Sequence, residues 1–456
     1  MRSDVRWAVV AATVALVAAL AGLAVPATYG ARTTADEPHY LLTALSLAED
    51  GDVDIADELA DERWRSFHRV ELPLQERVLA DGRMVSPHDP LLPVLLVPGV
   101  ALGGWVGAKI VLALLAAATA GATVLLATRR LAVAAPLAGV VTAVAFASWP
   151  LAAHATQVYP EMAAGLAVVL GTGAVTARRL HLRHVVVLVL AVVALPWLAV
   201  KYAPVAAALA AAALWRLRSR PRVVAATVAV LAVAGVVYLV VHQVVWTGWT
   251  VYASADHFVE RGEFSVVGFA PDPIGRSRRL VGLLLGRDFG LVVWQPAFLV
   301  VPAGVAVGLR DRVGRVLVLV AAAGWLTATF VALTMQGWWV PGRQVVLVLP
   351  LLVVLVATWL DRSPRPWAVP VTAVLGALGL VTGGWLVVDG LSGALTWVVD
   401  FASVGDPLHG LRRAVLPDYL RVTGRTWALQ AAWTCALGAL AWLGWRDGDP
   451  VRSRRA

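Results

Sequence analysis

An acid pair, Asp36-Glu37, closely follows the first long apolar run of the chain, Trp7 to Tyr29. A helix formed by that run would cross a membrane and bring both carboxylates to the water on the far side. Two carboxylates are not needed there to anchor a helix or to space two helices. Because a positioned carboxylate can take the proton of a reacting hydroxyl group, the pair indicates chemistry at the membrane surface.

Tyr40 follows the acid pair, and other polar residues occur where later apolar runs begin or end. They are candidates for contacts with a substrate: Tyr40, His88, Asp89, Tyr159, Glu161, Lys201, Tyr202, Arg287 and Arg343. Asp36 and Glu161 are also the residues that could hold a divalent ion, if the reaction uses one. The sequence identifies no other cofactor.

Most of these residues have a structural alternative. Glu161 could stabilise the first turn of a helix, where negative charge is favoured. Arg287 and Arg343 could be anchors whose charged groups reach the membrane interface. His88-Asp89 could hold a loop against the bilayer, and His154 is expected to be an interfacial histidine rather than a ligand.

Lys201 is harder to explain as a structural residue. It is one of only two lysines in the chain and lies between two apolar runs. An ionisable group in such a place costs about 2.5–3.5 kcal/mol unless it is paired or hydrated. We expect its partner to be an anionic group of the substrate; the alternative partner is a protein carboxylate, Glu161 or Asp36.

A sugar carried on a lipid phosphate would use all of these groups. Arginine and lysine would hold the phosphate and stabilise the charge that develops as it leaves. A carboxylate would act as general base toward the hydroxyl of the acceptor. The lipid tail would lie in a groove between apolar helices.

The composition is that of a membrane protein with many spans. Hydrophobic residues make up 59% of the 456 residues, charged residues 15%, and the mean hydropathy is +0.76. A soluble protein has about 25% charged residues. The net charge of +9 comes from arginines in short loops, which argues against a nucleic-acid partner, and the single cysteine, Cys435, excludes a disulfide framework.

Twelve apolar runs are candidates for membrane spans, the second of them a short apolar segment followed by a full span. They cover residues 7–29, 91–128, 131–153, 160–177, 185–200, 203–216, 222–245, 290–309, 315–334, 344–360, 367–388 and 426–445.

Arginine-rich loops alternate with arginine-poor loops along the chain, and this alternation predicts the topology. They concentrate at 129–130, 178–184, 216–222, 310–315, 362–365 and 446–455. By the positive-inside rule these loops are cytoplasmic, with both termini inside the cell and the protein in the plasma membrane. Segments 31–89, 246–288 and 389–425 then lie outside, and so do all the candidate residues.

The outer segment 31–89 is expected to be folded. Its residues 38–49 and 54–69 have spacings compatible with amphipathic helices on the membrane surface. The acid-rich stretch from Glu49 to Glu62 is expected to be mostly a solvated face.

The ordered set of motifs resembles the GT-C superfamily of integral-membrane glycosyltransferases. The residues that carry the resemblance are Asp36-Glu37-x-x-Tyr40, the segment Gly82 to Pro90, Tyr159-Pro160-Glu161, Arg287 to Pro296 and Gly342 to Pro350. They cover about residues 5–360. The similarity includes protein O-mannosyltransferases and lipid A aminoarabinose transferases, although His39 and His88-Asp89-Pro90 stand where the latter carry arginine and a lysine before two prolines.

The resemblance implies a polyprenyl-phosphate sugar as donor and Asp36 as catalytic base, assisted by Glu37 or Glu161. The acceptor would be a hydroxyl of a cell-envelope glycan, lipid or protein. The reaction would invert the configuration at the anomeric carbon of the sugar. The implied regions are a first transmembrane helix (1–30), an outer catalytic loop (31–89), a transmembrane core (90–360) and C-terminal helices (361–456). The rival hypothesis is a transporter or lipid flippase without enzymatic activity.

Overall fold

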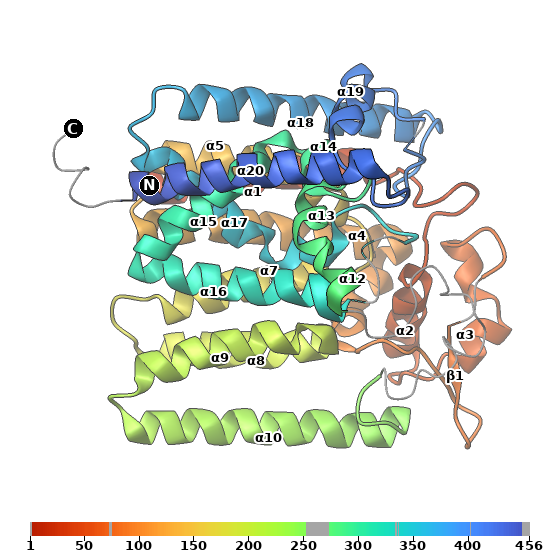
Figure 1. Ribbon diagram of the computed structural model, residues 1–456. Helices are drawn as coiled ribbons and strands as arrows, with labels where there is room; N and C mark the ends of the chain where they lie inside the picture. The colour runs from red at the N-terminus through yellow and green to blue at the C-terminus, as the bar shows by residue number, and fades with distance from the viewer. Residues whose placement is uncertain are drawn as a thin grey trace.

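The helices of the protein lie side by side along one common direction, with the connections at the two ends of the bundle (Figure 1). The computed structural model describes residues 2–72, 75–251, 273–332, 335, 337–401 and 403–448. Residues 252–272, in the middle of the expected outer segment 246–288, and residues 449–455 of the arginine-rich tail lie outside the described residues.

Each of the twelve apolar runs contains a helix. They are α1 (Ser3–Ala21), α4 (Leu91–Leu131), α5 (Ala135–Phe146), α7 (Glu161–Val175), α8 (Leu182–Leu198), α9 (Ala203–Leu217), α10 (Pro221–Trp246), α15 (Val301–Arg310), α16 (Arg312–Leu326), α17 (Leu349–Arg362), α18 (Ala368–Leu391) and α20 (Gly424–Asp447). Among the described residues, seven helical segments are long and apolar enough to cross a membrane, and four more are shorter apolar helices. The expected all-α polytopic membrane fold is confirmed.

Shorter elements precede, extend or connect these helices. They are α2 (Glu37–Glu49), α3 (Ala56–Ala60), η1 (Arg63–Ser66), β1 (Arg77–Val78), β2 (Met84–Val85), α6 (Leu151–His154), η2 (Val200–Tyr202), α12 (Pro273–Ser277), α13 (Arg279–Leu285), α14 (Leu291–Trp294), η4 (Pro296–Val300), η5 (Thr327–Val331), η6 (Arg343–Val348) and α19 (Pro407–Val415). Strands β1 and β2 pair antiparallel.

Two expected boundaries are wrong. The first helix ends at Ala21 rather than near Tyr29, because Gly22 takes the capping position and Pro26 cannot continue the helix. Residues 54–69 form α3 and η1 rather than one helix, and Glu62, with a φ of 52°, separates the two. The expected division of the run 91–128 is confirmed. Helix α4 is kinked at Gly103-Gly104, and its halves pack so closely that a side chain on Gly107 would overlap the Gly99 carbonyl.

Helix α17 forms the centre of the bundle. Every residue from Leu349 to Leu360 is buried. Helix α10, by contrast, lies at an edge (Figure 1), and only 11% of its apolar stretch is buried. Helix α1 packs on α4 through a stripe of small residues, Ala8, Ala11, Ala15 and Ala19, whose size allows close approach.

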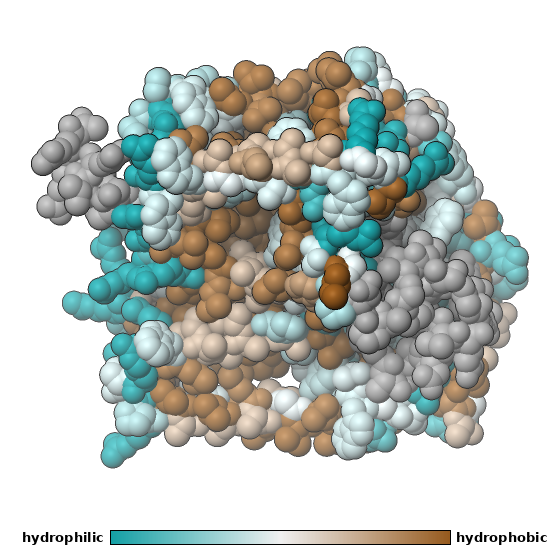
Figure 2. Space-filling view, viewed as in Figure 1, coloured by the Kyte–Doolittle hydropathy of each residue, from teal (hydrophilic) through white to brown (hydrophobic). Residues whose placement is uncertain are grey.

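Hydrophobic side chains form a broad band across the middle of the bundle, between ends where hydrophilic residues gather (Figure 2). This distribution is the one a bilayer requires, since polar groups are costly in the hydrocarbon layer. The protein is therefore membrane-embedded.

The segment 31–89 covers one end of the bundle, on the right in Figure 1, with α2 packed against α4. The expected helix at 38–49 is confirmed, but it lies inside the protein rather than on its surface: Tyr40, Leu41 and Leu42 are buried. In the acid-rich stretch, which is expected to be mostly solvated, Glu58 is an exception, since it is buried at 2% exposed.

Candidate active site

Asp36 lies immediately before the first turn of α2. The preceding residue, Ala35, has a φ of 46°, a left-handed conformation that is uncommon for residues other than glycine. The Asp36 side chain makes no capping hydrogen bond to α2. Its Oδ2 instead accepts a hydrogen bond from Arg343 Nη2 at 2.8 Å. The strained entry into α2 thus directs the carboxylate toward η6.

Arg343 joins two acids of the site. It follows Gly342, which has a φ of 86° and no room for a side chain, because a Cβ there would lie 2.9 Å from the Pro150 ring. Besides its contact with Asp36, Arg343 donates from Nε to Glu161 Oε1 at 2.9 Å. Its guanidinium lies 3.7 Å from the centre of the Tyr159 ring. Arg343 is therefore a bridge rather than a membrane-interface anchor, and its side chain is only 5% exposed.

Glu161, the first residue of α7, also pairs with Lys201. The Lys201 ammonium lies 3.1 Å from Glu161 Oε1 and 5.3 Å from the centre of the Tyr202 ring. Glu161 lies in the first turn of α7, where the helix dipole stabilises a negative charge. It also neutralises two buried or partly buried cations, Lys201 and Arg343. Lys201 lies in η2, between α8 and α9.

Glu37 is buried and fixes the loop before α7. Its Oε2 accepts from the Val158 backbone N–H at 3.0 Å, and its Oε1 accepts from the Thr34 N–H at 3.3 Å. Burial raises the pKa of Glu37 to about 7, although these two hydrogen bonds and the charge on Lys109 act in the opposite direction. Glu37 thus positions the chain around Asp36.

His88 lies on the other side of Asp36. Its Nε2 is 3.7 Å from Asp36 Oδ1, its Nδ1 is 2.7 Å from the Ser86 hydroxyl, and its ring lies 4.5 Å from that of Tyr40. Burial alone would raise the pKa of Asp36, but Arg343 and His88 outweigh it and hold the pKa well below its usual range. Asp36 is therefore ionised at neutral pH.

The side chains of this cluster differ in their access to solvent. Asp36 is 20% exposed, Lys201 16% and His88 12%, whereas Glu161 and Arg343 are almost completely buried. A ligand entering from solvent would therefore reach the first three groups before it reaches the buried pair.

Two residues proposed from the sequence lie in other clusters. Asp89 accepts from the Val200 N–H and the Tyr238 hydroxyl, both at 2.8 Å, and lies 3.0 Å from His242 Nε2. It ties α10 to the turn that carries Lys201. Arg287 pairs with Asp418 at 2.9 Å and lies 3.6 Å from Asp288.

The position of Arg343 does not favour a metal ion between Asp36 and Glu161. Arg343 lies between the two carboxylates and pairs with both, so a cation at that place would have to displace the guanidinium.

Two contributors to the site were not expected from the sequence. His154 is 1% exposed and buried in the protein, so the expectation of an interfacial histidine is wrong. Burial lowers the pKa of His154 to about 4, although the Glu161 charge acts in the opposite direction, so its ring is neutral at pH 7.

Trp339 is buried with its ring centre 5.2 Å from the Arg343 guanidinium. The pair Trp338-Trp339 next to Gly342-Arg343 was the available signal.

Comparison with known proteins gives a likeness at the level of the fold. No protein-family model matches the chain, and no curated protein sequence matches it significantly. The crystal structure of ArnT from Cupriavidus metallidurans bound to undecaprenyl phosphate superposes with a TM-score of 0.54 and 14% identity, over 97% of this chain and 76% of that one. ArnT in the apo state gives a TM-score of 0.47 and 15% identity, over 98% and 76% of the two chains. The expected resemblance to the GT-C glycosyltransferases is thereby confirmed for the fold: this chain has the fold of ArnT.

Proposed function

We propose that the protein is a membrane glycosyltransferase that moves a sugar from a polyprenyl phosphate to an acceptor hydroxyl at the outer face of the plasma membrane. The observation that carries the proposal is the ion-pair network of Asp36, Arg343, Glu161 and Lys201 at the covered end of an ArnT-like bundle. The solved ArnT holds undecaprenyl phosphate, a ligand of the same chemical class as the proposed donor.

In the proposed reaction Asp36 takes the proton of the acceptor hydroxyl while the acceptor oxygen attacks the anomeric carbon of the sugar. The bond from that carbon to the phosphate oxygen breaks, the configuration inverts, and polyprenyl phosphate leaves. Glu37 holds the chain that presents Asp36, through its contacts with the backbone N–H groups of Val158 and Thr34.

Arg343 couples donor binding to the basicity of Asp36. A carboxylate paired with a guanidinium is ionised but a weak base, because the cation stabilises its charge. A donor phosphate that pairs with Arg343 would draw the guanidinium away from Asp36 and raise the proton affinity of the carboxylate. Lys201 and His88, which are partly exposed, would complete the phosphate contacts, and Tyr40, Tyr159 and Tyr202 would line the donor site.

Sugar transfer by the purified full-length protein in detergent tests this proposal. We expect one member of a panel of polyprenyl-phosphate sugars to lose its sugar to an envelope acceptor, and Asp36→Asn to abolish most of that transfer. Absence of transfer from every donor, together with movement of polyprenyl phosphate across vesicles that contain the protein, would instead support a transporter or flippase.

A further inference from the structure

A cavity lined by arginines lies apart from the Asp36 cluster, among the loop that follows α13, α19 and the start of α20. Its volume is about 510 Å³. The lining cations are Arg287, Arg413, Arg421 and Arg425. Figure 1 places α19 and the start of α20 at the same end of the bundle as α2. The residues that line the cavity include none of Asp36, Glu161, Lys201 and Arg343.

Two aspartates neutralise only part of this charge. Arg413 donates to Asp288 Oδ1 from Nη2 at 2.7 Å and from Nε at 3.0 Å. Arg287 lies between Asp288 and Asp418, at 3.6 and 2.9 Å. The four arginines therefore exceed the two aspartates by two positive charges.

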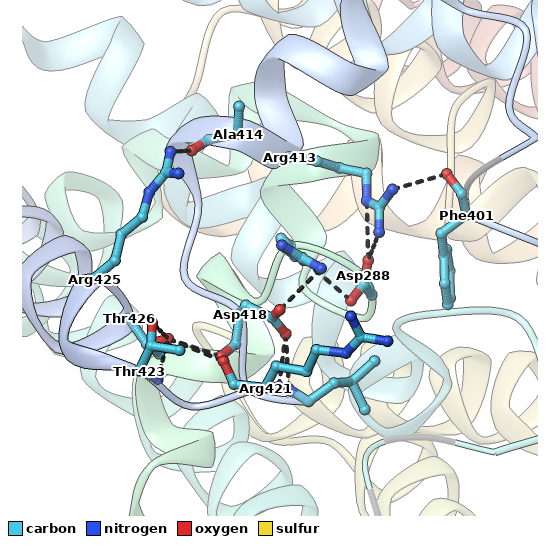
Figure 3. Close-up of polar contacts among 11 residues, drawn as sticks. Asp288, Phe401, Arg413, Ala414, Asp418, Arg421, Thr423, Arg425 and Thr426 are labelled. Carbon is cyan, nitrogen blue, oxygen red and sulfur yellow. Dashed lines mark hydrogen bonds and ion pairs between the residues drawn. The ribbon is translucent and has the colours of Figure 1, made fainter.

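The remaining two arginines supply that excess. Arg425 donates to the Ala414 carbonyl at 2.7 Å, a neutral partner that leaves its charge uncompensated. Arg421 is exposed, and among the described residues its guanidinium has no hydrogen bond or ion pair; Figure 3 draws a contact for its backbone only. Guanidinium groups without an acidic partner match phosphate oxygens in geometry and charge.

The surroundings of the cavity are apolar. Leu411, Leu420 and Trp427 are 64%, 53% and 48% exposed on the adjacent α19, loop and α20. A second, apolar groove of about 410 Å³ begins at Leu284 of α13 and reaches Ala441 of α20. Since Leu429 of the same helix lines the arginine cavity, the two hollows lie along one helix, roughly 18 Å apart at 1.5 Å per residue.

We propose that the arginine cavity binds the phosphate headgroup of a membrane lipid, with the lipid chain directed along α20 toward the apolar groove. The bound group is a phosphate ester with at least one negative charge that Arg421 and Arg425 can neutralise. This site is separate from the Asp36 cluster, and its binding does not depend on sugar transfer.

Direct binding to the full-length protein in detergent tests the site. The probes are dioctanoylphosphatidic acid, dioctanoylglycerol, which lacks the phosphate, and inorganic phosphate, which lacks the lipid. We expect phosphatidic acid to bind more tightly than either, and Arg421→Gln to weaken its binding by roughly 10-fold or more, the value of a charge-assisted hydrogen bond. Arg421→Lys should retain part of the affinity.

Arg312→Gln provides a matched control, because Arg312 is an exposed arginine at the start of α16, at the opposite end of the bundle. Arg425→Gln is the second test variant. Equal affinity of wild type, Arg421→Gln and Arg425→Gln for phosphatidic acid would overturn the site. Inorganic phosphate that binds as tightly as phosphatidic acid would overturn the lipid as occupant and assign the cavity to free phosphate. None of these readouts requires the protein to transfer a sugar, so failure of the proposed function would be recognised separately.

Discussion

Asp36 and Arg343, which are 307 positions apart in the sequence, form a 2.8 Å ion pair at the covered end of the bundle. The pair connects the segment 31–89 to η6, the turn that leads into the central helix α17. A charge pair that is mostly buried contributes when both partners are present and destabilises when one is removed. Variants at this pair must therefore be tested for folding as well as for activity.

Asp36→Asn should lower the rate of sugar transfer by roughly 10²–10⁴-fold, which is the usual contribution of a general base. The amide keeps the size of the side chain but cannot accept a proton. The measurement is turnover with saturating donor, per molecule that remains monodisperse. Glu49→Gln is a suitable control, since Glu49 is a carboxylate of the same segment whose ion pair with Arg63 is exposed. Near-normal turnover of Asp36→Asn would exclude Asp36 as the base.

Lys201→Ala should weaken donor binding by roughly 10–100-fold, if a charge-assisted hydrogen bond to the phosphate is lost. Lys201→Arg should recover only part of the affinity, because a planar guanidinium does not replace a compact ammonium. The measurements are the Kd for the donor and the Tm of the same preparations.

The alternative is that Lys201 only neutralises Glu161, to which it lies at 3.1 Å. Both Lys201 variants would then lower the Tm while the Kd for the donor stayed the same. Glu161→Gln separates the roles further, since it frees Lys201 from its protein partner and should not weaken binding of an anionic donor through Lys201.

Glu58 should make the protein less stable at alkaline pH. Burial raises the pKa of Glu58 from 4.5 to about 8, so the folded chain keeps a proton that the unfolded chain loses above about pH 4.5. The contribution of protonated Glu58 to the free energy of unfolding is therefore fully present below pH 4.5 and falls as the pH rises to about 8. Glu58→Gln, which carries no titratable proton, should have a higher Tm than wild type above pH 8 and a similar Tm near pH 4.5. An equal pH dependence of Tm in both proteins would contradict this assignment.

Cysteine labelling in a Cys435→Ala background should place segment 31–89 outside the cell. Asp52→Cys, at an exposed position in this segment, should react with an impermeant maleimide in intact cells. Arg315→Cys, exposed at the opposite end of the bundle, should react only after the membrane is opened. The reverse pattern would invert the proposed topology and place the candidate active site on the cytoplasmic face.

The sequence by itself determined the class of fold. Apolar runs of membrane length, interrupted by arginine-rich loops, leave few alternatives to a helical bundle, because backbone polar groups in lipid must be paired within each helix. The kink of α4 was likewise predictable from the apolar run that is too long for one span. The end of α1 at Ala21 was not, since the following residues are apolar and only Gly22 and Pro26 mark the stop.

The sequence also identified most of the charged residues that meet at the site, but only the tertiary structure decided how they pair. Glu161, Lys201 and Arg343 come from α7, η2 and η6, and Asp36 immediately precedes α2, so their meeting depends on how these elements pack. The same packing moved Asp89 and Arg287 into other clusters and buried His154 beside the site. Patterns of hydropathy and charge are local properties of the sequence and predict the membrane helices and loops directly. An ion pair between distant residues depends on distances of a few ångströms, which are set only by the packing of the helices.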